Sequence, residues 1–187
     1  MDNFSEGAFS NPQDAGFQTI LFNGNVNDKS ALLLIKHVQE AIRESKKGVW
    51  VGIKSDGGAP GAARFVYDYL SSIEFPAISH AIDVFSEGTN LAAAFPHRSI
   101  ALTGKIGFHQ AALNLPGGSF HEGILSDLLQ QVMGHNRAML DHLMLSTGLP
   151  EETIRPWIYN GAVFVGEEAV KPFHPRPLEH KILDVTE

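Results

Sequence analysis

The 187-residue chain contains no cysteine. Disulfide bonds and thiolate metal sites are therefore excluded, and the composition suits a reducing compartment, so we expect the cytoplasm. No apolar run approaches the ~18 residues that a membrane-spanning helix requires. Residues 1–16 are polar and acidic and lack the apolar block of a signal peptide. The sequence predicts a soluble protein with a flexible arm over 1–16 and no membrane partner.

Basic residues are also few. Lys and Arg total 14 against 21 Asp and Glu, which gives a formal net charge of −7. Nucleic-acid binding depends on clustered cations that neutralise phosphates, and no such cluster occurs. The nine histidines form no HxH or HxxxH pair that would indicate a metal site. We therefore predict no nucleic-acid partner, no metal and no cofactor.

The apolar residues that are present follow an alternating strand and helix pattern. Strand-like runs occur at 17–22, 49–54, 76–85, 99–103 and 105–110, and helix-like stripes follow each of the first three. A long helical pattern then extends to residue 147, a shorter helix begins at Pro150, and a last strand is expected at 180–185. This order predicts a parallel α/β sheet in a single domain over 17–187.

Three polar segments fall where predicted strands end. They are "SDGG" at 55–58, Ser86 in "VFSEGTNLAAAF", and His109 in "GFHQ". The carboxyl ends of parallel strands meet at one edge of a sheet, where sites form. Ser86 alone has two readings: serine is a favoured helix N-cap, and it is also a nucleophile. His109 alone is as readily a structural histidine in a strand.

Together these residues form the parts of an acyl-transfer site. Such a site needs a hydroxyl, a base within hydrogen-bond reach and backbone N–H groups directed at the oxyanion. A serine at a strand-to-helix turn lies at the positive end of the helix dipole, and the next amide, that of Glu87, is free. The Gly57-Gly58 pair can supply a second amide with no side chain in the way. His109 would act as the base.

The same segments resemble the Clp protease proteolytic subunit, a self-compartmentalising serine peptidase of the ClpP/crotonase fold. The resemblance extends from about Phe17 to Val185. It rests on "ILFNGNVND" for the family's first strand and turn, "IKSDGGAPGAARFVYDYL" for its "INSPGG" loop and helix, "FSEGTNLAAAF" for "ASMGAFLLAAG", "GFHQA" for "MIHQP", "LMLSTGLPEETI" for "ALHTGQ" and "GEEAV" for "SAPEAV".

The resemblance implies repeated β-β-α units and a protruding handle, a strand plus a long helix, at about 112–147. It implies that Ser86 is the nucleophile and His109 the base, with the oxyanion held by Glu87 N–H and by Gly58 N–H, or alternatively Gly57 N–H. It also implies homo-oligomeric rings that stack through the helix after Gly123, an AAA+ unfoldase partner, and small or unfolded polypeptides as substrates.

The sequence departs from the family at several positions. The segment that carries the family's triad aspartate reads "YNGAVFVGEEAV", which offers Asn160 or Gly161 and no carboxylate. Asn160 can orient the His109 ring by accepting a hydrogen bond, but it cannot stabilise an imidazolium as a charge does. Asp56 replaces the usual proline, and Glu87 replaces the usual methionine, with its side chain expected to point away from the oxyanion. The arm is also shorter than the family's, which weakens the case for an unfoldase partner.

Three functions are consistent with this pattern. The first is a ClpP-like serine endopeptidase inside an oligomeric chamber. The second is a catalytically impaired ClpP-like subunit or scaffold, favoured by the missing aspartate and opposed by the presence of both Ser86 and His109. The third is a crotonase-type acyl-CoA enzyme, which would not need that Ser–His pair.

Overall fold

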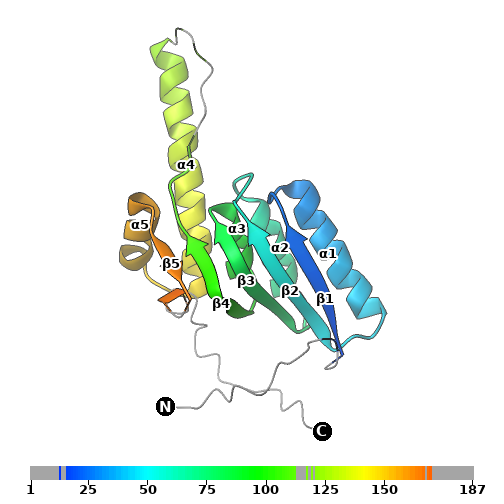
Figure 1. Ribbon diagram of the computed structural model, residues 1–187. Coiled ribbons are helices and arrows are strands. Elements are labelled where there is room, and N and C mark those ends of the chain that lie inside the picture. The colour runs from blue at the N-terminus through cyan, green and yellow to red at the C-terminus, as the bar shows by residue number, and fades with distance from the viewer. Residues whose placement is uncertain are drawn as a thin grey trace.

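The protein is an α/β structure with one mixed five-stranded sheet (Figure 1). The computed structural model describes residues 13, 16–112, 117, 119, 121–166 and 168–169. Within them the elements are β1 (Phe17–Asn23), α1 (Asp28–Arg43), β2 (Gly48–Ser55), α2 (Ala62–Ser71), β3 (Ala77–Phe85), α3 (Glu87–Ala93), β4 (His97–Gly107), α4 (Glu122–Thr147), α5 (Glu151–Asn160) and β5 (Val163–Val165). Nearly all of the predicted arm, the handle strand before 121, and the predicted strand at 180–185 lie outside the described residues.

Strand order follows chain order, β1-β2-β3-β4-β5, and β1 to β4 are parallel. Connections between adjacent parallel strands are almost always right-handed, so their helices must lie on the same face. Figure 1 shows α1, α2 and α3 side by side behind the sheet. Alternate residues of β3, including Ala77, Ser79 and Ala81, are buried under them. The core therefore lies between this helix layer and one face of the sheet.

The predicted parallel sheet is found in β1 to β4, but the sheet is mixed, because β5, where no strand was predicted, pairs with β4 in the antiparallel sense. The cause is the turn after α5: Gly161 has a left-handed φ of +67°, and it directs the chain back along β4. β5 then lies beside the end of β4, with Val163 opposite Gly107.

The two short strands predicted at 99–103 and 105–110 are also wrong, because they form one strand, β4. Its pairing with β3 shifts register between Ala81 and Asp83 instead of breaking. Gly104 permits this irregularity, because a Cβ there would lie 2.6 Å from the Ile82 carbonyl oxygen. His109 consequently lies beyond the end of β4, not inside a strand.

The helix predicted to end at residue 147 is confirmed as α4, whose C-cap is Gly148 in the left-handed conformation. Its C-terminal half packs against the body of the protein, where Leu140 and Leu143 are buried. Its first half projects well beyond the sheet (Figure 1) and exposes Ile124, Leu125, Leu129 and Met133. Among the described residues, no helix has both the length and the apolarity that crossing a bilayer would require.

Candidate active site

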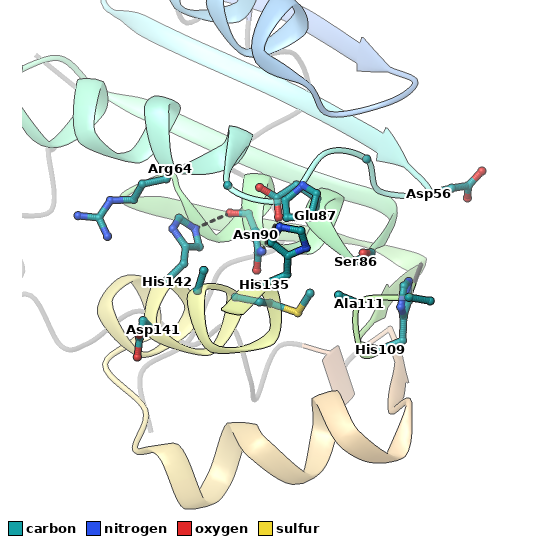
Figure 2. A pocket seen from close by; sticks show the side chains of 16 residues that line it. Asp56, Arg64, Ser86, Glu87, Asn90, His109, Ala111, His135, Asp141 and His142 are labelled. Atoms are coloured by element: carbon teal, nitrogen blue, oxygen red, sulfur yellow. Dashed lines mark hydrogen bonds between the residues drawn. The ribbon is translucent and has the colours of Figure 1, made fainter. Parts of the chain in front are cut away.

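A cavity lies where β2, β3 and β4 end. It has a volume of about 680 Å³ and an open mouth. Ser86, His109, Glu87 and Gly58 line it, and α4 closes its other side with His135, Ala138, Met139, Asp141 and His142. Figure 2 shows Ser86 and His109 toward one end of this cavity and His142 and Arg64 toward the other. The parallel strands thus bring sequence-distant polar residues to one place.

Ser86 joins β3 to α3 in an unusual backbone conformation. Its φ is +54° and its ψ is −124°, a region that non-glycine residues rarely adopt and that costs about 1–3 kcal/mol. The strain is held in place by two hydrogen bonds: Ser86 N–H donates to the Gly107 carbonyl at 3.1 Å, and Thr89 Oγ1 donates to the same carbonyl at 2.7 Å. A strained strand-to-helix turn is the arrangement that presents a serine Oγ to a site.

The Ser86 hydroxyl does not cap α3. Its side chain accepts no helix N–H, and it has no hydrogen-bond partner in the described part of the chain. The helix-cap reading of this residue is therefore wrong. The Ser86 side chain is left free to act in the cavity.

Glycines allow the backbone to close tightly around Ser86. A Cβ on Gly57 would lie 2.8 Å from Ser86 Cβ, and a Cβ on Gly88 would lie 2.8 Å from Ser55 Cβ. Gly107 leaves room for the Phe85 ring, which a Cβ would meet at 2.2 Å. The first turn of α3 can approach β2 and β4 only because these positions carry no side chain.

Unpaired backbone amides adjoin this turn. Glu87 begins α3, and its N–H donates to no group among the described residues. Gly58 lies opposite Val26 in a β-bridge, but the two hydrogen bonds of the bridge are made by Gly57 C=O and Ala59 N–H. Gly58 N–H therefore also has no partner among the described residues. Gly57 N–H, in contrast, donates to Ser55 Oγ at 3.2 Å. Of the two glycines considered from the sequence, Gly58 has the free donor.

The Glu87 side chain is turned toward the start of α2. Its Oε1 accepts from Ala63 N–H at 2.9 Å and its Oε2 accepts from Asn90 Nδ2 at 2.7 Å. The N-cap residue of α2, Gly61, has no side chain, so this carboxylate acts as the cap. Burial raises the pKa of Glu87, and these hydrogen bonds oppose that rise. Figure 2 shows the carboxylate directed away from Ser86.

His109 is exposed at the mouth of the cavity, and a neighbouring carbonyl orients its ring. Nδ1 lies 2.7 Å from the Gln110 carbonyl oxygen. A carbonyl can only accept, so Nδ1 carries the proton and Nε2 presents a lone pair. That is the tautomer a general base requires.

The segment around His109 is fixed by both α4 and α5. The Phe108 ring packs against Trp157 and Phe164, with centroid separations of 5.5 and 6.0 Å. Ala111 N–H donates to the buried Asn136 Oδ1 at 2.6 Å, and Gln110 Nε2 donates to the Tyr159 carbonyl at 3.1 Å. These contacts position a residue that no strand holds.

The remaining predicted site residues, Asn160 and Asp56, make no hydrogen bond to Ser86 or His109. Asn160 ends α5, is exposed, and has no hydrogen bond to His109, whose Nδ1 is occupied by the Gln110 carbonyl. Asp56 lines the edge of the cavity, and its carboxylate points away from Ser86 (Figure 2). Ser86 and His109 face the same cavity without a direct hydrogen bond between them. Such bonds often tighten only when substrate is bound.

Sequence reasoning missed the polar end of the cavity. Asn90 follows Ser86 by one helical turn, and His142 reaches the cavity from α4; both are buried. The i, i+4 spacing of Ser86 and Asn90 was available in the sequence as a signal. Nothing local marks His142, because a long-range packing contact brings it there.

The chain matches no known family model, and a comparison with curated proteins found no significant relative. Within the described residues, no group of three or more His, Asp and Glu side chains is arranged to hold a metal ion.

Proposed function

We propose that this protein is a serine-type peptidase in which Ser86 is the nucleophile and His109 the general base. One observation carries the proposal. Ser86, at a strained strand-to-helix turn, shares a cavity with His109, whose Nδ1–H donates to a carbonyl. Within the described part of the chain, the Ser86 hydroxyl and the His109 Nε2 have no hydrogen-bond partner. Neither feature is explained by helix capping or by core packing.

The reaction follows the two-step course of acyl transfer. Ser86 Oγ attacks the carbonyl carbon of a peptide bond while His109 Nε2 takes the hydroxyl proton. The negative oxygen of the tetrahedral intermediate accepts hydrogen bonds from Glu87 N–H and Gly58 N–H. The C–N bond then breaks, and His109 gives its proton to the leaving amine. Water, deprotonated by His109, hydrolyses the acyl-enzyme.

The catalytic rate should be low for a serine peptidase. The Gln110 carbonyl selects the right tautomer of His109, but it is neutral and stabilises the imidazolium less than a carboxylate would. Replacing the orienting aspartate of such a site by a neutral group costs on the order of 10⁴ in kcat, much of it through the wrong tautomer. Because the Gln110 carbonyl selects the His109 tautomer that a general base needs, we expect a smaller loss of kcat than this.

The finer fold assignment, a ClpP-like handle and ring assembly, belongs to the same proposal. It is supported by the projecting first half of α4, whose exposed apolar side chains have no partner within the described chain. A ring of subunits, or stacked rings, would cover them and restrict the substrate to small or unfolded polypeptides. An AAA+ unfoldase remains a predicted partner on the resemblance alone.

A catalytically impaired scaffold is the second candidate function. The specific observation in its favour is that, within the described ranges, the hydrogen-bond partner of the His109 ring is the Gln110 carbonyl and not a carboxylate. On this alternative the cavity and the assembly are retained while Ser86 is unreactive.

Labelling with a fluorophosphonate probe separates the two functions. The peptidase predicts one phosphonylated residue, located at Ser86 by peptide mass spectrometry and lost in Ser86→Ala. The matched control is Ser55→Ala, which removes a nearby buried hydroxyl and should retain labelling. Wild-type protein that stays unlabelled from pH 6 to 9 rejects the peptidase in favour of the scaffold.

A further inference from the structure

The end of the cavity beyond Ser86 contains two buried hydrogen-bond acceptors that no group in the described part of the chain satisfies. Asn90 and His142 are only 3% and 5% exposed, yet Asn90 Oδ1 and His142 Nδ1 have no hydrogen-bond partner among the residues that the structure describes. Both residues line the cavity that contains Ser86. Buried polar atoms are nearly always paired in folded proteins, so two orphaned acceptors in one cavity point to a ligand that pairs them.

The identity of both orphaned atoms as acceptors follows from their neighbours. Asn90 Nδ2 donates to Glu87 Oε2, which leaves Oδ1 as the free atom of that amide. His142 Nε2 lies 2.9 Å from the Asn90 carbonyl oxygen and must carry the proton there. Burial lowers the pKa of His142 to about 4, so the ring is neutral and Nδ1 holds a lone pair.

We propose that Asn90 and His142 form a specificity subsite for an uncharged side chain that donates hydrogen bonds, above all the primary carboxamide of glutamine or asparagine. A carboxamide NH₂ has two donors, which matches the number of unpaired acceptors. Asn90 follows Ser86 by one helical turn, about 6 Å along α3, which is within reach of the side chain next to the carbonyl under attack. This inference deepens the proposed function and rests on it.

The surrounding charges disfavour ionised side chains. An anion would meet two acceptors and the Glu87 carboxylate. A cation would find Arg64 in the same cavity, while the nearby acids are already paired: Asp68 Oδ1 accepts from Arg64 at 2.7 Å, and Asp141 Oδ1 pairs with Arg137 at 2.7 Å. An apolar side chain would leave both acceptors buried and unpaired, which carries a free-energy cost.

Binding to the Ser86→Ala variant tests recognition without reaction. The probes are peptides of the form acetyl-Ala-Ala-Xaa-N-methylamide, measured by titration calorimetry. Gln is compared to its near-isostere Met, Asn is compared to Leu, and Lys and Glu peptides represent charged side chains. We expect Gln and Asn to bind on the order of 10- to 100-fold more tightly than their apolar counterparts. Equal affinities, a preference for Met, Lys or Glu, or no binding of any peptide at millimolar concentration overturns the subsite.

Side-chain replacements then test whether His142 is responsible for the preference for Gln over Met. His142→Leu, added to Ser86→Ala, should bring the Gln-to-Met affinity ratio close to one. The Asn90 carbonyl keeps its helical partner, Ala94 N–H at 3.0 Å, in this variant. His135→Leu is the matched control: it removes another cavity-lining histidine from the same face of α4 and should leave the ratio unchanged. If His142→Leu does not fold, the comparison of Gln and Met peptides in the Ser86→Ala variant, which retains His142, still tests the subsite.

Failure of the subsite and failure of the peptidase give different results. A labelled Ser86 with no Gln or Asn preference rejects the subsite and leaves the peptidase. A clear Gln and Asn preference with an unlabelled Ser86 supports the subsite as a binding site and rejects the peptidase. In an active enzyme, the same preference should appear in kcat/KM for peptide cleavage.

Discussion

Ser86 has a backbone conformation that favours glycine, at a position where the side chain is needed for the proposed chemistry. The strained conformation is maintained because two hydrogen bonds to the Gly107 carbonyl, from Ser86 N–H and Thr89 Oγ1, hold the turn in place. A serine retained for packing alone would gain stability by relaxing into an ordinary cap. The conformation is instead consistent with a hydroxyl held at a fixed point in the cavity.

This strain makes a stability prediction for Ser86. Ser86→Gly should raise the free energy of unfolding by about 1 kcal/mol relative to Ser86→Ala, because glycine accepts a φ of +54° and alanine does not. Urea denaturation of both variants measures the difference. Alanine is the matched control, since both variants lack the hydroxyl. Equal stabilities would contradict a strained turn.

The buried ring of His142 gives the stability of the protein a pH dependence. Its pKa is lowered from 6.5 to about 4; burial is the main cause, Arg64 and Arg98 act in the same direction, and the Asn90 carbonyl and Asp68 oppose them. Between these two pH values the unfolded chain binds more protons than the folded one, so stability falls as the pH falls. His142 should contribute about 3 kcal/mol to this loss between pH 7 and pH 4.

Urea denaturation at a series of pH values measures that contribution. His142→Leu should have a shallower slope of stability against pH than the wild type from pH 6.5 down to pH 4. Subtracting the two curves removes the titration of the other groups, including His80, whose pKa burial also lowers. Parallel curves would show that His142 is accessible to protons in the folded state.

At the scale of elements, the site depends on how closely α3 approaches β2. Gly88→Ala would place a Cβ 2.8 Å from the Ser55 carbonyl oxygen, so the first turn of α3 must shift. We expect a stability loss of about 1–3 kcal/mol and at least a tenfold loss of fluorophosphonate labelling, because the Glu87 amide moves with the turn.

Gly134→Ala is the matched control for this change. Gly134 lies within α4, and a Cβ there would meet nothing within 4 Å. Alanine should therefore stabilise the helix by roughly 0.5–1 kcal/mol and leave labelling unchanged. If Gly88→Ala behaves as Gly134→Ala does, the close approach of α3 is not required.

Element identity was predictable where a local pattern determined it. The apolar stripe and Asn27 cap of α1, the run that forms β3, and the left-handed Gly148 that ends α4 are all local features. The continuity of β4 was not predictable, because a glycine such as Gly104 usually indicates a strand break in sequence, and only the pairing with β3 shows that the strand continues. The antiparallel direction of β5 likewise depends on α5 packing first.

At the scale of the whole molecule, the projecting half of α4 exposes apolar side chains that a monomer would not retain. Leu129 and Met133, one turn apart, are 60% and 61% exposed. We predict that this surface holds subunits together. Leu129→Glu should shift the sedimentation coefficient toward that of the monomer, with unchanged circular dichroism.

Gln130→Glu is the matched control, since it adds the same charge to an exposed polar position on the same helix. It should leave the assembly unchanged. A wild-type protein that sediments as a monomer at all concentrations would contradict the assembly prediction.

The candidate site was predictable from the sequence only in part. Ser86 and the glycines of "SDGG" follow strands directly, so the meeting of parallel strand ends was enough to place them together. The ring partner of His109 was not foreseeable, because the Gln110 carbonyl is a backbone atom oriented by contacts with α4 and α5. The spacing of Asn90 from Ser86 was a local signal, but the contact between Asn90 and His142 depends on packing between α3 and α4, which no local signal encodes.

The most direct test of the central claim is the rate at which a fluorophosphonate labels Ser86 with and without His109. If His109 is the base, His109→Ala should lower the second-order rate constant by about 10²–10⁴-fold while circular dichroism stays the same. His135→Ala should label at the wild-type rate. Equal labelling rates for wild type and His109→Ala would show that the Ser86 hydroxyl and the His109 imidazole do not act together.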